Sequence, residues 1–295
     1  MFLNLIKKYL LVFVYAFVGY TFINWLISTR LNININEKYL DLWVPVALCI
    51  AVTYFIFRPI VKQLKYSEKS KDFLLWFIIP FTIWFPIVFS QKYFKDISYK
   101  IISINKPSEL YNFPRERFFK IKSFSVISDD YFIMRERHAS GKNGTTLNVL
   151  NYYIAPVYDD NSKNTTDKFS TIGYGVQFST SMHNGFFDEK SQEPIIKNFN
   201  KKSTEDYNKY EFYKVDYFEK IKNSDNAEFF LKAIQHHNNF DKSVDCLVIV
   251  NRSESLHDLF SREQKMFLYS TFISLCIGLL AICLVNLFSG RKITD

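Results

Sequence analysis

The hydrophobic and polar positions divide this chain into four long apolar runs and one polar stretch. A helix needs about 20 apolar residues to cross a bilayer core of about 30 Å. Runs near this length lie at about 9–29, 42–60, 73–91 and 266–288. They predict four transmembrane helices. The first run is too long and too bulky for a cleavable signal peptide, so we expect it to be a retained helix.

In the polar stretch, hydrophobic and polar residues alternate with a period of two in four segments. This pattern predicts β-strands at 118–126, 131–137, 146–157 and 171–180. Glycines in the last of these suggest a bulge or a close backbone approach. Helical spacing predicts a helix at 226–237, and a short apolar run predicts a central strand at 244–250. The segment 210–218 is ambiguous. The segments 159–168 and 188–209 are polar and are expected to be exposed loops.

The fold expected is therefore a membrane protein with four transmembrane α-helices and one α+β extracytoplasmic domain dominated by antiparallel β-sheet. One or two helices are expected on a face of that sheet. The expected domains are a three-helix membrane region at 1–92, the extracytoplasmic domain at 93–265, and the fourth helix with a short cytoplasmic tail at 266–295. A helix beginning near Ser255 should run into the fourth span, because no Gly or Pro interrupts it before Gly278.

A basic cluster in the loop between the second and third spans predicts the orientation of the chain. Such clusters are held on the cytoplasmic side of a membrane. Positions 58–71 contain five basic residues and a single acid, Glu68. The basic residues are Arg58, Lys62, Lys65, Lys69 and Lys71. The expected topology has both termini in the cytoplasm and the 93–265 domain in the periplasm of a bacterial-type cell, with the helices in its inner membrane.

The net charge of +8 does not predict nucleic-acid binding, because the excess is not on the polar domain. Residues 93–265 contain 25 Lys and Arg and 24 Asp and Glu. The basic excess lies at the span ends, where it orients helices and meets anionic lipid head groups. We therefore expect contact with the lipid bilayer and no nucleic-acid partner.

Few residues have the spacing of a catalytic or metal site. The pair His236 and His237 is expected at the surface of a helix end, because consecutive helical residues point about 100° apart and rarely bind one ion. The segment 141–146 predicts a hairpin turn rather than a phosphate loop, and 159–164 a solvated loop rather than a calcium site. Cys246 is expected as a buried core thiol, and no disulfide framework is predicted. No catalytic residue, cofactor or metal ligand is predicted.

Charged and small residues give two structural expectations. Arg115 with Arg117, and Arg135 with Arg137, are expected to pair with acids across strands rather than to clamp a ligand carboxylate. Small residues four apart in two spans would allow close helix packing: Ala47 with Ala51, and Ser274 with Gly278. Ionisable residues are missing from the interiors of the predicted spans, which argues against a transporter.

These patterns favour a non-enzymatic inner-membrane protein whose periplasmic domain binds a protein partner. The function expected first is that of a subunit in an envelope complex such as a secretion apparatus. One alternative is a membrane immunity protein that neutralises a toxin acting in the periplasm or inserting into the membrane. The other is a membrane-anchored hydrolase or transferase, because enzymes can assemble sites from residues distant in sequence.

Overall fold

The computed structural model describes residues 2–31, 39–63, 68–159, 170–184, 189–221, 225–241, 243 and 245–290. The chain divides into two compact units. The helical unit comprises Met1–Tyr99 and Glu254–Asp295, and the sheet unit comprises Lys100–Ser253.

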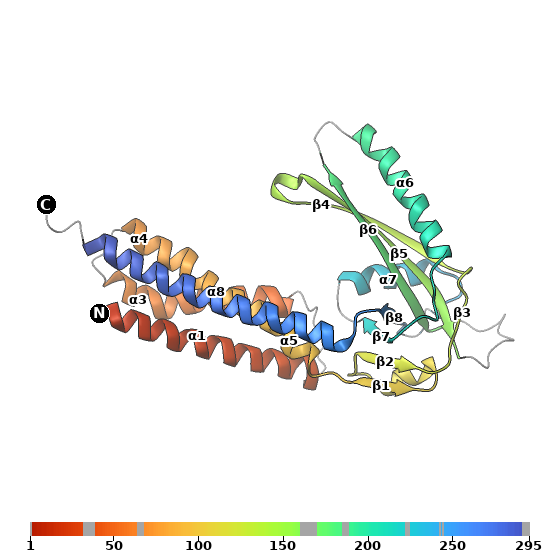
Figure 1. Cartoon of the computed structure of the whole chain (residues 1–295), viewed down its shortest axis with the longest axis horizontal. Helices are drawn as coiled ribbons and strands as arrows, with labels where there is room; N and C mark the ends of the chain where they lie inside the picture. The colour runs from red at the N-terminus through yellow and green to blue at the C-terminus, as the bar shows by residue number, and fades with distance from the viewer. Residues whose placement is uncertain are drawn as a thin grey trace. The chain divides into compact units, whose positions relative to one another are not determined.

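Within its described residues, the helical unit has four helices long and apolar enough to cross a membrane: Leu3–Ser28, Tyr39–Lys62, Glu68–Asp96 and Leu256–Leu287. The four predicted spans are confirmed, and they indicate a multi-pass membrane protein in contact with lipid. The first span consists of α1 (Phe2–Trp25) and η1 (Leu26–Leu31), and the second of η2 (Tyr39–Trp43), α2 (Val44–Val52), η3 (Thr53–Phe57) and α3 (Arg58–Lys62). The third consists of α4 (Glu68–Phe73), η4 (Leu74–Ile78) and α5 (Ile79–Asp96), and the fourth is α8 (Leu256–Gly290) (Figure 1).

The helix α8 is unbroken from just after Ser255 through the fourth span, as predicted. Its start is capped, because the Ser255 hydroxyl oxygen accepts a hydrogen bond of 3.1 Å from the Asp258 amide. The first turns of α8, ahead of the apolar run, belong to the helical unit.

The sheet unit is built on a mixed, mostly antiparallel sheet of eight strands in the described residues, in the order β1-β2-β7-β8-β6-β5-β3, with β4 also paired to β5. Its elements are β1 (Ile101–Ile104), η5 (Pro107–Asn112), β2 (Phe118–Ile121), β3 (Ser125–Val126), β4 (Phe132–Ser140), η6 (Lys142–Gly144), β5 (Thr146–Tyr158), β6 (Ile172–His183), α6 (Glu189–Asn208), β7 (Tyr217–Ile221), α7 (Asp225–His236) and β8 (Leu247–Arg252). The predicted mostly antiparallel α+β sheet is confirmed; β1 with β2 and β6 with β8 are its parallel pairs.

The helices α6 and α7 cover opposite faces of the strands β4, β5 and β6 (Figure 1). Alternate residues of β5 show this division. Tyr153 packs in the cluster that contains Tyr207 of α6, whereas Tyr152 packs with Phe230 of α7. The sheet is therefore a middle layer between two helices, and the expectation of helices on a single face is corrected.

Two glycines of β6 leave room for packed side chains, Gly175 for Phe230 of α7 and Gly173 for Ile154 of β5. A β-carbon on Gly175 would lie 2.8 Å from the Phe230 ring, and one on Gly173 would lie 2.5 Å from Ile154. These distances are too short for packed carbon atoms. The close backbone approach that the sequence suggested for these glycines is confirmed.

The segment 188–209 is not the exposed loop that its polarity predicted, because it contains α6. Polar side chains of α6 bind the sheet alongside its few buried apolar residues, such as Ile196 and Tyr207. Asn151 of β5 donates hydrogen bonds to Asn200 (3.0 Å) and to Ser203 (2.7 Å). The other expected loop, 159–168, lies outside the described residues apart from Asp159.

The predicted strand at 118–126 proves to be two strands with different partners. β2 lies between β1 and β7, whereas β3 pairs with β5. The chain therefore leaves β2, next to the edge strand β1, after Ile121 and joins the opposite edge of the sheet at Ser125. This crossing produces the gap described next.

Candidate functional site

A gap opens in the sheet where β2 and β7 stop pairing. The two antiparallel strands pair Phe118 with Glu219 and Phe119 with Phe218. In the same register, residues 120–124 would continue to face residues 213–217, but the strands diverge there. A cavity of about 310 Å³ lies between the two segments.

Strand geometry turns main-chain groups towards this gap from both walls. The amide of Lys122 bonds to Ile104 of β1, while the carbonyl of Arg117 accepts from Lys220 of β7. Because peptide groups alternate in direction along a strand, those of Ile121 point the same way as those of Arg117, towards β7. The same alternation turns the peptide groups of Asp216 towards β2.

The side chains of the gap combine positive charge with aromatic surface. Lys120 and Lys122 are exposed, and Tyr213 is 65% exposed. The Tyr213 ring lies 5.3 Å from that of Phe124, and its hydroxyl accepts a 3.3 Å hydrogen bond from the Val126 amide. The lining residues are Lys120, Ile121, Lys122, Ser123, Phe124, Tyr213, Val215, Asp216, Tyr217 and Phe218.

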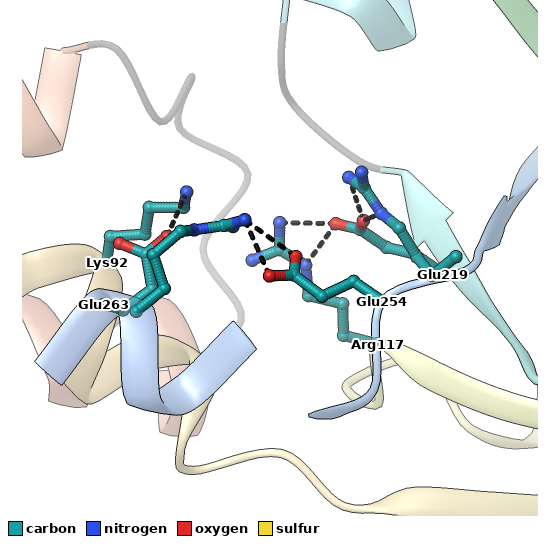
Figure 2. Close-up of polar contacts among 7 residues, drawn as sticks. Lys92, Arg117, Glu219, Glu254 and Glu263 are labelled. Carbon is teal, nitrogen blue, oxygen red and sulfur yellow. Dashed lines mark hydrogen bonds and ion pairs between the residues drawn. The ribbon is translucent and has the colours of Figure 1, made fainter. Parts of the chain in front are cut away.

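A buried ion-pair cluster lies at the closed end of the gap, where the strands still pair. Glu219 of β7 is only 4% exposed and contacts two guanidinium groups. Arg117 donates to one carboxylate oxygen at 2.6 Å, and Arg252 of β8 donates to the other at 2.5 Å. Figure 2 shows the Glu219 carboxylate beside Arg117. One side chain thus ties β2, β7 and β8 together.

Burial and the two arginines act in opposite directions on the Glu219 pKa. Burial alone would raise it, because a charged carboxylate loses water. The charges and hydrogen bonds of Arg117 and Arg252 outweigh this effect and lower the pKa below its ordinary value of 4.5. Glu219 is therefore ionised at neutral pH, and the cluster is fully formed there.

The helical unit contains a second polar cluster, at one end of its spans. Lys95 of α5 donates to the Asp41 carboxylate at 2.9 Å. Asn24 of α1 donates both to Asp41 (2.9 Å) and to Gln91 (2.7 Å). Ionisable groups inside membrane helices usually pair with one another or mark functional sites. Here they link α1, the second span and α5.

One ion pair joins α5 to α8 within the same unit, and another joins α8 to the residue Glu254 just before it. Lys92 contacts Glu263 at 2.7 Å, and Arg262 donates to both carboxylate oxygens of Glu254 at 2.7 and 2.8 Å. Figure 2 shows Lys92, Glu254 and Glu263. The first turns of α8 are thus fixed to α5 by an ion pair as well as by packing.

The residues predicted to determine topology lie at the ends of helices. Arg58 begins α3 and lies over the Tyr54 ring at 4.7 Å. Lys62 ends α3, and Lys69 and Lys71 lie in α4. Lys65 falls outside the described residues.

The two small-residue pairs lie in different surroundings. Ser274 is buried, and Gly278 lies so close to α1 that a β-carbon there would be 2.1 Å from the Tyr9 hydroxyl. Ala47 and Ala51 are exposed within the helical unit. The structure therefore places Ser274 and Gly278 in a helix contact and Ala47 and Ala51 outside one.

His237 is not the surface residue that the sequence predicted. Its side chain is buried, accepts a 3.1 Å hydrogen bond from the Asn239 amide and lies 3.2 Å from the Asp130 carbonyl. The chain turns back at the end of α7, so His237 packs inward while His236 stays exposed. Its ring ties the end of α7 to the loop before β4.

The cysteines and acids offer no site of their own. All four cysteines are free. Cys246 is half-buried rather than fully buried, and burial followed by the nearby Asp241 and Asp245 raises its pKa, so its thiol is a poor nucleophile. Among the residues that the structure describes, no three His, Cys, Asp or Glu side chains are grouped to hold a metal ion.

Comparison of the chain with protein-family models, with curated proteins and with solved structures gave no match. The gap between β2 and β7 is therefore the candidate site on its geometry alone.

Sequence reasoning identified one residue beside this site and missed the rest. The cross-strand acid expected for Arg117 is Glu219. Arg137 instead contacts Glu193 of α6, at 3.4 Å. The sequence predicts one strand through residues 120–124 and leaves 210–218 ambiguous. No local signal marks the point where β2 ends, because residues 118–126 keep one alternation of side chains.

The Glu219 cluster predicts an acid-sensitive sheet unit. A carboxylate whose folded pKa is lowered stabilises the fold above its unfolded pKa, and this contribution is lost as pH falls through the folded pKa. Glu219→Gln should lower stability at pH 7 by about 2–3 kcal/mol, because two partly exposed arginines lose their carboxylate. The measurement is the urea midpoint for proteolysis of the sheet unit in the detergent-solubilised chain.

In the same titration, the difference between wild type and Glu219→Gln should shrink as pH falls below about 4.5. Glu211→Gln is the matched control, because its pairing with Lys214 is exposed. A difference between Glu219→Gln and wild type that stays constant down to pH 3 would show that the cluster does not stabilise the sheet electrostatically.

Breaking the buried Asp41–Lys95 pair should destabilise the helical unit more than breaking the exposed Lys71–Glu68 pair. The Lys95 side chain is 5% exposed, whereas in the Lys71–Glu68 pair the Glu68 side chain is 82% exposed. Asp41→Ala should cost about 2 kcal/mol, since the cost of breaking a buried pair is reduced by partial exposure of Asp41. Glu68→Ala should cost less than about 1 kcal/mol. Tryptophan fluorescence during unfolding in detergent reports this unit, because all four tryptophans lie in it. Equal costs would refute a structural role for the buried pair.

Proposed function

We propose that this chain is a multi-pass inner-membrane protein whose sheet unit lies in the periplasm and binds a protein partner there, as a subunit of an envelope complex such as a secretion apparatus. The observation that carries the proposal is the gap between β2 and β7. It offers main-chain groups, aromatic surface and positive charge at one place in the sheet.

The lining of the gap favours recognition over chemistry. Its ten residues include two lysines, one aspartate and one serine, but no histidine, cysteine or glutamate. A nucleophile needs a base within hydrogen-bond reach, and this lining does not pair Ser123 with an imidazole. Aromatic rings and exposed main chain are instead what an extended protein segment uses when it adds to a sheet.

The proposed location rests on charge. Short loops next to spans carry their excess of Lys and Arg on the cytoplasmic side. The cluster from Arg58 to Lys71 supplies that excess between the second and third spans. Because a single span, the third, separates this cluster from the sheet unit in sequence, placing the cluster inside places the sheet unit outside.

Reporter fusions test this orientation. A reporter fused at Ser67 should lie in the cytoplasm and a reporter fused at Ser162 should lie in the periplasm, because one span separates the two positions. Alkaline phosphatase, which is active in the periplasm, should be active only at Ser162. A fluorescent protein that is active in the cytoplasm should be active only at Ser67. Cytoplasmic readings at both positions would place the partner inside the cell and refute the proposed location.

Partner binding through the gap is tested by Tyr213→Ala. This change removes an exposed ring from the lining, and it should abolish co-purification of the membrane-extracted chain with its partner. Ile195→Ala is the matched control, because Ile195 is 53% exposed on α6 of the same unit and does not line the gap. Both variants should keep the protease-resistant sheet unit.

Loss of the partner in both variants, or in neither, would refute the gap as its binding site. A captured partner that proves to be a toxin, with cells protected only by the wild-type chain, would replace the complex-subunit function by an immunity function.

A further inference from the structure

We infer that the gap between β2 and β7 takes an extended segment of the partner in which acidic side chains occupy alternate positions. The inference rests on the proposed function and specifies the chemistry of its ligand. It follows from three features of the gap: its main chain, its two lysines and its aromatic floor.

The main chain of the gap matches an extended ligand. β2 and β7 part after Phe119 and Phe218, so the peptide groups of Ile121 and Asp216 face the gap. An extended segment entering there would donate and accept main-chain hydrogen bonds as a strand does. A helical ligand would have its own peptide groups already paired and would gain nothing from these walls.

The lysines set the spacing of the acids. Lys120 lies in β2 and Lys122 lies just past its end, and both exposed lysines line the gap. Side chains two residues apart on one face of a strand are about 6.6–6.8 Å apart. Alternate side chains of an extended ligand have the same spacing. Lys122 also donates to the side-chain oxygen of Asn105 at 3.1 Å, a neutral acceptor that leaves its charge uncompensated. Charge-assisted contacts to carboxylates are the contacts that two such ammonium groups favour.

The aromatic pair of Phe124 and Tyr213 favours apolar residues between the acids of the ligand. The Phe124 ring lies 5.3 Å from the ring of Tyr213 and 5.3 Å from that of Phe218, so this aromatic surface begins at the last strand pair. An apolar side chain of the ligand can cover these rings while its neighbours meet the lysines. The negative charge of Asp216 on the opposite wall repels carboxylates of the ligand, so the acidic side chains of the ligand should lie on the β2 side.

Three labelled hexapeptides test the inference on the full chain in nanodiscs. Each alternates valine with one polar residue, which is glutamate, glutamine or lysine. The glutamate peptide should bind, measured by fluorescence anisotropy, and the glutamine peptide should bind roughly tenfold more weakly because it lacks both charged contacts. Inorganic phosphate at equal ionic strength should not displace the glutamate peptide, since it has no main chain.

Charge reversal gives the decisive variant. Lys120→Glu with Lys122→Glu should reverse the preference, so that the lysine peptide binds more tightly than the glutamate peptide. Lys201→Glu with Lys202→Glu makes the same charge change on exposed positions of α6 and should leave the order unchanged. Equal binding of the glutamate and glutamine peptides, an unchanged order after reversal in the gap, or full displacement by phosphate would each overturn the inference.

These outcomes are separable from the proposed function. If the glutamate peptide fails to bind while Tyr213→Ala still abolishes partner co-purification, the ligand chemistry is wrong and the binding site stands. If Tyr213→Ala leaves co-purification intact, the binding site itself is wrong.

Discussion

The contact between Glu219 and its two arginines is the constraint on which the candidate site depends. A carboxylate that is 4% exposed requires compensating charge, and Arg117 and Arg252 supply it from the strand on either side. The contact holds β2, β7 and β8 in register up to Phe119 and Phe218. Immediately beyond it, the chain leaves β2 to reach β3 at the other edge of the sheet. The gap exists because the strands are fixed at one end and separate at the other.

Buried charge and close packing organise the helical unit in a similar way. Asp41 and Lys95 connect spans through a partly buried ion pair, and Lys92 with Glu263 connects α5 to the start of α8. Further into the bundle, Gly278 leaves the space that the Tyr9 ring occupies. Tyr9 also donates a 2.9 Å hydrogen bond to Thr82, so a hydroxyl contact adds to packing between α1 and α5. A rigid set of spans of this kind suits an anchor for a binding unit.

The parts of the fold that depend on local pattern could be predicted. Long apolar runs gave the four spans, and alternation gave most of the long strands β4, β5 and β6. The helix α6 was missed because Asn200 and Ser203, which accept hydrogen bonds from Asn151, interrupt the apolar residues of its inward face. Buried charge at the span ends was missed because the helices extend beyond the apolar runs to Asp41 and Lys95.

The site itself could not be predicted, for a different reason. Its two walls are about 90 residues apart in the sequence, and its existence depends on where their pairing stops. Residues 118–126 alternate well enough to form one strand, and nothing local shows that the chain changes partners after Ile121. Arg117 was recognised as a residue needing an acid, but only the fold identifies that acid as Glu219.

Hydrogen–deuterium exchange at single-residue resolution tests the central claim most directly, because it reports where the pairing of β2 with β7 ends. In the full chain in nanodiscs, the amides of Phe119 and Phe218 should be protected by the ladder, whereas those of Ile121 and Asp216 should exchange at least about tenfold faster because they face the gap. Addition of the partner should slow exchange at Ile121 and Asp216 alone. Equal protection at all four amides in the free chain would show a continuous ladder, and would contradict the gap and the function built on it.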